Sequence, residues 1–254
     1  PCSREAAAAT ARIGSAREAA ALALVECRRW QADDAINALE CIASRLGEED
    51  AAEAERLRAR ARTVRLAARL AAALSLAHWQ RAEDAIASDA AGVLSALADK
   101  GEYAVAAEVE SVPAAAGAPA AARAAVRAAH AADLVARRGL GAGTLAALKY
   151  LSTLGAGTAD AAFEAMRRVP LAAKHSLVAF LSRREGTLTA AQRQRLERVA
   201  LGVDVLAALP APWDERWQAG TWVKNRTGQT AQAVALRRNM TPAQRSRLDA
   251  LPYG

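Results

Sequence analysis

Alanine content is the feature of this sequence that most constrains its fold. Hydrophobic residues make up 53% of the 254 residues and aromatic residues only 4%, so alanine supplies most of the hydrophobic fraction. Alanine is the strongest helix former, and its small side chain is readily buried between closely packed helices. Runs rich in valine, isoleucine and threonine, which indicate strands, are absent. The sequence therefore predicts an all-α fold of stacked helical hairpins, arranged as an α-solenoid or an irregular bundle.

Charge is distributed unevenly along the chain. Residues 1–112 contain 14 basic and 18 acidic residues, whereas residues 113–254 contain 20 basic and nine acidic residues, within a net charge of +7. Such an asymmetry indicates that the C-terminal part meets an anionic partner. Almost all of this positive charge is arginine.

Part of the N-terminal region is duplicated. The segment from Trp30 to Ile36 is repeated from Trp79 to Ile86, each copy preceded by an alanine-rich helix, and the repeat predicts helical hairpins with an aromatic residue at the turn. The paired acids that follow each tryptophan, Asp33-Asp34 and Glu83-Asp84, are expected in the first turn of a helix. Residues 15–110 resemble tetratricopeptide-type hairpins, although an ordinary bundle with one duplicated hairpin explains the repeat equally well.

A long helix is expected between the two copies, over about residues 49–78. Arginines recur along it at offsets of 0, 4, 7 and 11, which places Arg58, Arg62, Arg65 and Arg69 on one stripe. A solvated helix face and a ridge that follows phosphates are both compatible with this stripe.

Proline and glycine divide the rest of the chain. We expect an acidic domain of helical hairpins over 1–112, a linker over 113–120, short helical hairpins over 121–185 and a basic three-helix module over 186–254. The linker contains two prolines and a glycine, and the charge balance changes there.

A second duplication lies in the C-terminal region. The segment from Leu188 to Val199 is repeated from Met240 to Leu251, and in each copy a threonine, Thr189 or Thr241, can cap a helix whose leucine faces the core. Residues 186–254 resemble the helicase-associated domain, a small three-helix module, through these matching residues: Trp217, Trp222, Val223, Arg226, Met240, Thr241, Arg245 and Leu248. Asn225 departs from the family's usual glutamine, the first helix is abbreviated, and the closing aromatic is Tyr253.

This resemblance implies contact with nucleic acid, and the side chains favour it independently. Eleven cations lie within about 65 residues, interleaved with three tryptophans, which suits binding to backbone phosphates. The candidate nucleic-acid-binding residues are Arg183, Arg184, Arg193, Arg195, Arg198, Lys224, Arg226, Arg237, Arg238, Arg245 and Arg247. A solvated surface is the alternative interpretation of these arginines, and the tryptophans are also suited to the core of a small bundle.

No pattern of catalytic, cofactor-binding or metal-ligating residues is recognisable. The three histidines and three cysteines lie outside the spacings that indicate metal sites or disulfide frameworks, and no phosphate-binding loop or nucleophile motif occurs. No apolar run is long enough to cross a membrane. We therefore expect a protein without enzymatic activity, metal or cofactor, in a reducing compartment such as the bacterial cytoplasm or an organelle matrix.

Three functional hypotheses follow from the sequence. The first is a scaffold whose basic C-terminal half binds nucleic acid, RNA rather than DNA, within a ribonucleoprotein or ribosome, while its acidic N-terminal hairpins contact protein. The second is a protein-binding solenoid adaptor without a nucleic-acid role. The third is an accessory fragment of a larger helicase-like enzyme.

Overall fold

The fold is all-α, as the composition predicts. The computed structural model describes residues 2–155 and 157–207, and within these ranges it contains eleven α-helices, four short 3₁₀ turns and no strand. The chain divides into two compact units between Pro119 and Ala120, at the end of the segment that was expected to be a linker.

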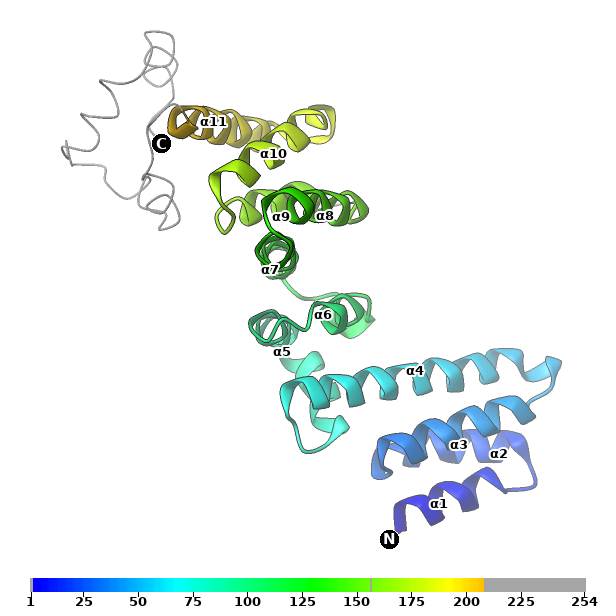
Figure 1. The fold of residues 1–254 in the computed structure, drawn as a ribbon. Helices are drawn as coiled ribbons and strands as arrows, with labels where there is room; N and C mark the ends of the chain where they lie inside the picture. Colours follow the sequence, from blue (N-terminus) through cyan, green and yellow to red (C-terminus); the bar gives the residue numbers. More distant parts are fainter. Residues whose placement is uncertain (1, 156, 208–254) are drawn as a thin grey trace. The chain divides into compact units, whose positions relative to one another are not determined.

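The first unit contains six helices that pack largely against their neighbours in the sequence, as seen for the stacked helices α2, α3 and α4 (Figure 1). The helices of this unit are α1 (Cys2–Ala11), α2 (Ala16–Glu26), α3 (Ala32–Arg45), α4 (Ala51–Leu74), α5 (Trp79–Asp99) and α6 (Tyr103–Glu110). Its 3₁₀ turns are η1 (Cys27–Arg29), η2 (Glu48–Asp50) and η3 (Pro113–Ala115). Alanines of α2, α3 and α4 are buried beside a few leucines and isoleucines, so the helices approach one another closely.

The long helix between the two tryptophan segments is confirmed as α4, with shorter bounds than expected. It ends at Leu74; the next residue, Ser75, has a φ of 59° in the left-handed region, and the backbone N–H of Leu76 donates to the carbonyl of Ala71 at 2.8 Å. This left-handed residue closes the helix by satisfying carbonyls of its last turn. Ser15 directly precedes α2 and caps it, because its hydroxyl accepts from the backbone N–H of Glu18.

Helix α5 is interrupted in its middle. Asp89 has φ −148° and ψ 68°, which is not helical, and its carboxylate oxygen Oδ1 accepts from the backbone N–H of Gly92 at 2.8 Å. Asp89 therefore caps the second half of α5 with its own side chain.

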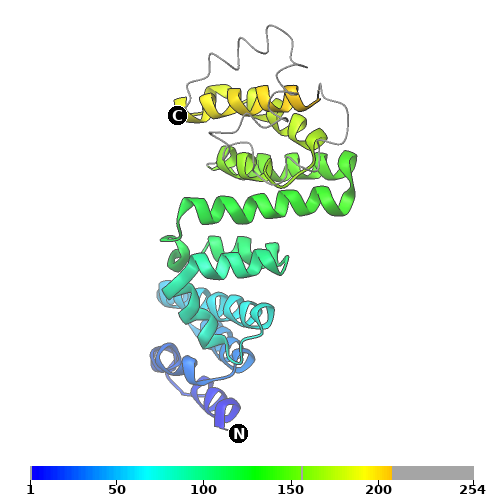
Figure 2. The ribbon, with the colours of Figure 1, turned by 90° about the vertical axis from the view of Figure 1, so that its left-hand side faces the viewer.

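The second unit is formed by α7 (Ala120–Arg138), α8 (Leu140–Thr153), α9 (Thr158–Ala165), α10 (Leu171–Ser182), η4 (Glu185–Thr187) and α11 (Ala190–Ala207). Helices α7 and α8 run side by side (Figure 2), and Gly143 lies where they cross. Any Cβ at this position would lie 2.6 Å from the carbonyl oxygen of Leu134 and 2.7 Å from the Cα of Val135. Glycine is therefore required here for close approach of the two helices.

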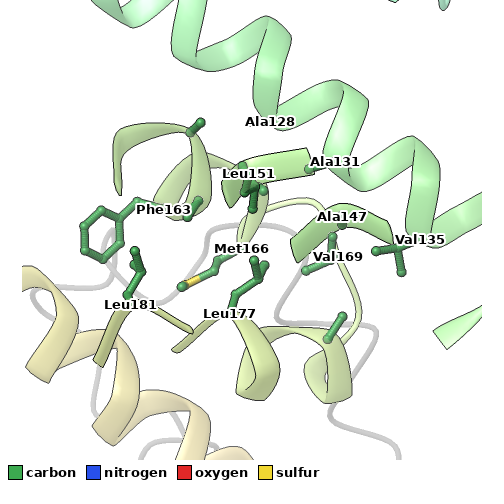
Figure 3. Close-up of a cluster of buried hydrophobic side chains, with 14 of the residues drawn as sticks. Ala128, Ala131, Val135, Ala147, Leu151, Phe163, Met166, Val169, Leu177 and Leu181 are labelled. Atoms are coloured by element: carbon green, nitrogen blue, oxygen red, sulfur yellow. The ribbon is translucent and has the colours of Figure 1, made fainter. Parts of the chain in front are cut away.

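One hydrophobic cluster joins α7 to α11. Figure 3 shows Phe163, Met166, Leu177 and Leu181 gathered within it, beneath the alanines of α7. Leu188 and Leu196 belong to the same cluster. The prediction that Leu196 faces the core is thus confirmed, and α11 is part of the same packed body as α7–α10 in the described part of the chain.

Candidate nucleic-acid interface

Five of the eleven candidate cations lie within the described residues, on the hairpin formed by α10, η4 and α11. Arg183 and Arg184 directly follow α10, whereas Arg193, Arg195 and Arg198 lie on the first three turns of α11. Four of the five side chains are exposed and Arg184 is half-buried. The other six candidates lie outside the described residues, as do the three tryptophans interleaved with them and most of residues 186–254.

The start of α11 is fixed by a reciprocal pair of hydrogen bonds. The backbone N–H of Gln192 donates to the hydroxyl of Thr189 at 3.2 Å, and the backbone N–H of Thr189 donates to Oε1 of Gln192 at 3.0 Å. This arrangement is a capping box, in which two backbone donors at the helix start are satisfied at once. The expected cap by Thr189 is therefore confirmed.

Contacts with α9 and with the core orient the same helix. The side-chain amide of Gln192 donates to Oδ1 of Asp160 at 2.9 Å, and Leu196 is only 6% exposed. With these residues turned toward the rest of the unit, the arginines of α11 project from a helix that is held on both its first turn and its buried face.

Two of the arginines lie over phenylalanine rings. The guanidinium carbon of Arg195 is 4.6 Å from the ring centroid of Phe163, and that of Arg184 is 4.6 Å from the ring centroid of Phe180. A cation at this distance from a ring centroid is attracted by the negative face of the ring. The pair of Phe163 and Arg195 could not be predicted from the sequence, because the two residues lie 32 positions apart. Phe180 and Arg184 are four residues apart at a helix end, and this spacing could have indicated their contact.

The remaining three arginines are left without an acidic partner. Among the described residues, Arg183, Arg193 and Arg198 form no ion pair, whereas Arg167 and Arg137 of the same unit pair with Glu164 and Asp133. These two pairs each lie within one turn of helix, at spacings of three and four residues. These three guanidinium groups are therefore not held by any described carboxylate.

The arginine stripe of α4 is arranged differently. Three of its members form ion pairs with carboxylates: Arg62 with Glu55 at 2.5 Å, Arg65 with Glu40 at 2.8 Å and Arg69 with Glu108 at 2.6 Å. Arg58 is exposed and forms no ion pair with a described residue. Guanidinium groups that are already paired are poorly suited to bind phosphates, so the stripe is better explained as a solvated helix face whose arginines pair within α4 and with α3 and α6.

The prediction for the second pair of acids was wrong. Asp33 does lie in the first turn of α3, but α5 begins at Trp79, so Glu83 falls in its second turn. Glu83 instead forms an ion pair through both carboxylate oxygens with Arg60, and Asp84 pairs with Arg28 at 2.6 Å. Ion pairs with other helices and turns, rather than the helix dipole, explain the positions of these two acidic residues. The Glu83 hydrogen bond raises the pKa of Arg60.

Few thiols or potential metal ligands occur in the described part of the chain. Cys27 is a buried free thiol and Cys41 an exposed one, and no group of three or more potential metal ligands occurs among the described residues. Within the same residues, no helix combines the length and the apolar character that crossing a membrane requires.

Comparison of the chain with family models, with curated proteins and with solved structures finds no match.

Proposed function

We propose that this chain is a non-catalytic helical scaffold whose basic C-terminal half binds nucleic acid, RNA in preference to DNA, within a larger assembly such as a ribonucleoprotein. Contact with phosphates places a protein on nucleic acid without reading its sequence, so the proposed binding is general rather than sequence-specific. The resemblance of residues 186–254 to the helicase-associated domain favours the same partner.

One observation carries the proposal, namely the contrast between the paired arginines of α4 and the unpaired arginines of α11. In the first unit, Arg62, Arg65 and Arg69 are held by carboxylates of the same unit. In the second unit, Arg193 and Arg198 are exposed on α11 without a described acidic partner. A protein surface that leaves guanidinium groups unpaired and exposed retains their full attraction for phosphate oxygens.

The proposal is tested by measuring the affinity of the full chain for a fluorescent single-stranded RNA and for DNA of the same sequence over a salt series. If the five described arginines contact phosphates, affinity should fall about 100-fold between 50 and 200 mM salt. Absence of salt-dependent binding at 50 mM would rule out the nucleic-acid hypothesis.

A pair of charge-reversal variants localises the binding. The double variant Arg193→Glu, Arg198→Glu should bind at least about tenfold more weakly at 50 mM salt and show a shallower salt dependence. The matched control is Arg58→Glu, Arg81→Glu, which makes the same change in net charge at two exposed arginines of the first unit. Equal losses in both double variants would mean that net charge, and not the α11 surface, determines the binding.

A second candidate function is supported by a separate observation in the first unit. Leu22 and Val25 lie on one face of α2 and are 42% and 74% exposed, so two large apolar side chains face solvent side by side. A protein partner on the N-terminal hairpins would cover them. An adaptor that binds only protein becomes the preferred hypothesis if the salt series detects no RNA or DNA binding.

A further inference from the structure

We infer that Arg184 and Arg195 are stacking platforms for unpaired nucleobases, so that the nucleic acid bound by the second unit is single-stranded. This inference rests on the proposed function, and it specifies which form of nucleic acid the α10–α11 surface takes.

The first platform is Arg195 over Phe163. Phe163 is only 2% exposed, while Arg195 itself is exposed on α11 and its guanidinium group lies 4.6 Å from the ring centroid. The guanidinium group therefore covers the outer side of a core aromatic ring and forms the surface at that point. A planar cation fixed in this way offers its other face to solvent, where a flat base can stack.

The second platform is Arg184 over Phe180, at the end of α10. The ring belongs to a residue that packs against the edge of the same hydrophobic cluster as Phe163, and the distance from the guanidinium carbon to the ring centroid is again 4.6 Å. Neither Arg184 nor Arg195 forms an ion pair with a described carboxylate, so both groups can donate hydrogen bonds to phosphate from their edges while a base covers their faces.

An arginine of the first unit shows what a purely structural version of this contact looks like. Arg60 lies over the ring of Trp79 at 5.6 Å, but its guanidinium group is bound by both carboxylate oxygens of Glu83. Arg184 and Arg195 have the ring contact without the carboxylate. The ring holds each guanidinium group in place, and the positive charge of that group is not neutralised by a described carboxylate.

Stacking distinguishes single strands from duplexes, because the bases of a duplex present only their edges. Removal of a stacking contact typically weakens binding to single strands by roughly five- to 150-fold per base. Phosphate contacts alone would not discriminate in this way, since both forms of nucleic acid carry them.

The first test uses the unaltered protein and three RNA probes of twelve nucleotides, followed by fluorescence anisotropy. The probes are a single strand, a blunt duplex and a single strand in which abasic residues keep the phosphates but remove the bases. The single strand should bind at least fivefold more tightly than either of the other two. Equal affinity for the single strand and the abasic strand would overturn the inference while leaving phosphate binding, and with it the proposed function, intact; failure of all three probes to bind would remove both.

The second test exploits two matched pairs of arginines in the chain. Lysine keeps the charge of arginine but has no planar group to stack, so Arg184→Lys and Arg195→Lys should each weaken single-strand binding at least fivefold and change duplex binding less than twofold. The neighbouring variants Arg183→Lys and Arg193→Lys, at exposed arginines that lie over no described ring, should change both affinities less than twofold. Equal effects within each pair would contradict the stacking role. Thermal unfolding of the four variants, followed by circular dichroism, should show native-like melting, which separates a lost platform from a lost fold.

Discussion

The indole N–H of Trp79 donates a hydrogen bond to the main-chain carbonyl oxygen of Trp30 at 3.1 Å, and both side chains are almost fully buried. The two copies of the N-terminal repeat are thereby joined through their tryptophans, 49 residues apart. The adjacent Gln80 reinforces the junction, since its side-chain amide donates to the carbonyl oxygens of Arg28 and Trp30. The repeated residue is therefore the point at which one hairpin is fastened to the next.

The tryptophan junction makes a first prediction. Trp79→Phe should lower the free energy of unfolding by about 1 kcal/mol more than Trp30→Phe, measured by urea denaturation. Both changes remove a similar buried volume, but only the first removes a hydrogen bond to a described residue. Equal losses would mean that the Trp79 bond contributes nothing beyond packing.

The cap inside α5 makes a second prediction. Asp89→Ala should lower the free energy of unfolding by about 1 kcal/mol, because the backbone N–H of Gly92 loses its acceptor. A Cβ at Gly92 would lie 2.1 Å from the Asp89 carboxylate, so Gly92→Ala displaces the cap in the native protein. In the Asp89→Ala background there is no carboxylate to displace, and alanine is the better helix former. The effect of Gly92→Ala on the free energy of unfolding should therefore be about 1 kcal/mol more favourable in the Asp89→Ala background than in the wild type. A double-mutant cycle that shows no coupling between the two positions would contradict this account.

The crossing of α7 and α8 makes a third prediction. Gly143→Ala should lower the free energy of unfolding by about 1–3 kcal/mol, since the added methyl group meets the α7 backbone rather than a side chain that could rotate away. Gly141→Ala is the matched control on the same helix. No atom lies within 4 Å of a Cβ at that exposed position, so this change should stabilise the protein by about 0.5–1 kcal/mol. Chemical denaturation of both variants would show effects of opposite sign, and a neutral Gly143→Ala would contradict the close approach.

A fourth prediction concerns His130, which packs against Tyr150 with ring centroids 4.4 Å apart. Burial lowers the pKa of His130; Asp133 opposes this effect and Arg137 adds to it. A lowered pKa means that the unfolded chain takes up a proton at His130 at a higher pH than the folded protein does. The contribution of His130 to stability is thus fully present above the unfolded pKa of about 6.5 and is lost as the pH falls toward the folded value.

Thermal melts of the wild type and of His130→Gln between pH 7.5 and 5 would test this directly. The wild type should lose stability more steeply with falling pH than the variant does. Parallel pH profiles would show that His130 is not the group responsible.

Local patterns were the part of the fold that could be predicted from the sequence. Thr189 was recognised as a cap because a cap depends on residues three positions away, and α4 was expected because its arginines recur at helical spacing. Helix α1 was not expected. Half of its ten residues are alanine, without a clear apolar stripe, and it forms contacts with α2 and α3 that bury Ala7.

The error over Glu83 and Asp84 arose from the alignment of the two repeats. Trp30 precedes its helix by two residues, whereas Trp79 is the first residue of α5, and the second copy contains one additional residue, Arg81. The same motif therefore has a different position relative to each helix. A repeat in sequence indicates a repeated contact, but it does not fix where the helix begins.

The surroundings of the arginines could not be predicted from the sequence. The stripe at 58, 62, 65 and 69 looked as basic as the arginines of α11, and only the folded chain brings Glu40 and Glu108 to Arg65 and Arg69. Partners that lie 25 and 39 residues away in the sequence leave no local pattern. The Phe163 ring beneath Arg195 is hidden from sequence analysis for the same reason.

Much of the buried surface in both units consists of alanine methyl groups, for example at Ala19, Ala20 and Ala23 of α2 and at Ala161, Ala162 and Ala165 of α9. At such positions almost every replacement adds atoms, and a neighbouring helix has few long side chains that could rotate to make room. The spacing between helices is consequently set by main chain against main chain. An enlarged residue in these contacts would have to be accommodated by displacing a whole helix, so small changes in the interior would be transmitted to the outer faces of the hairpins instead of being absorbed where they occur.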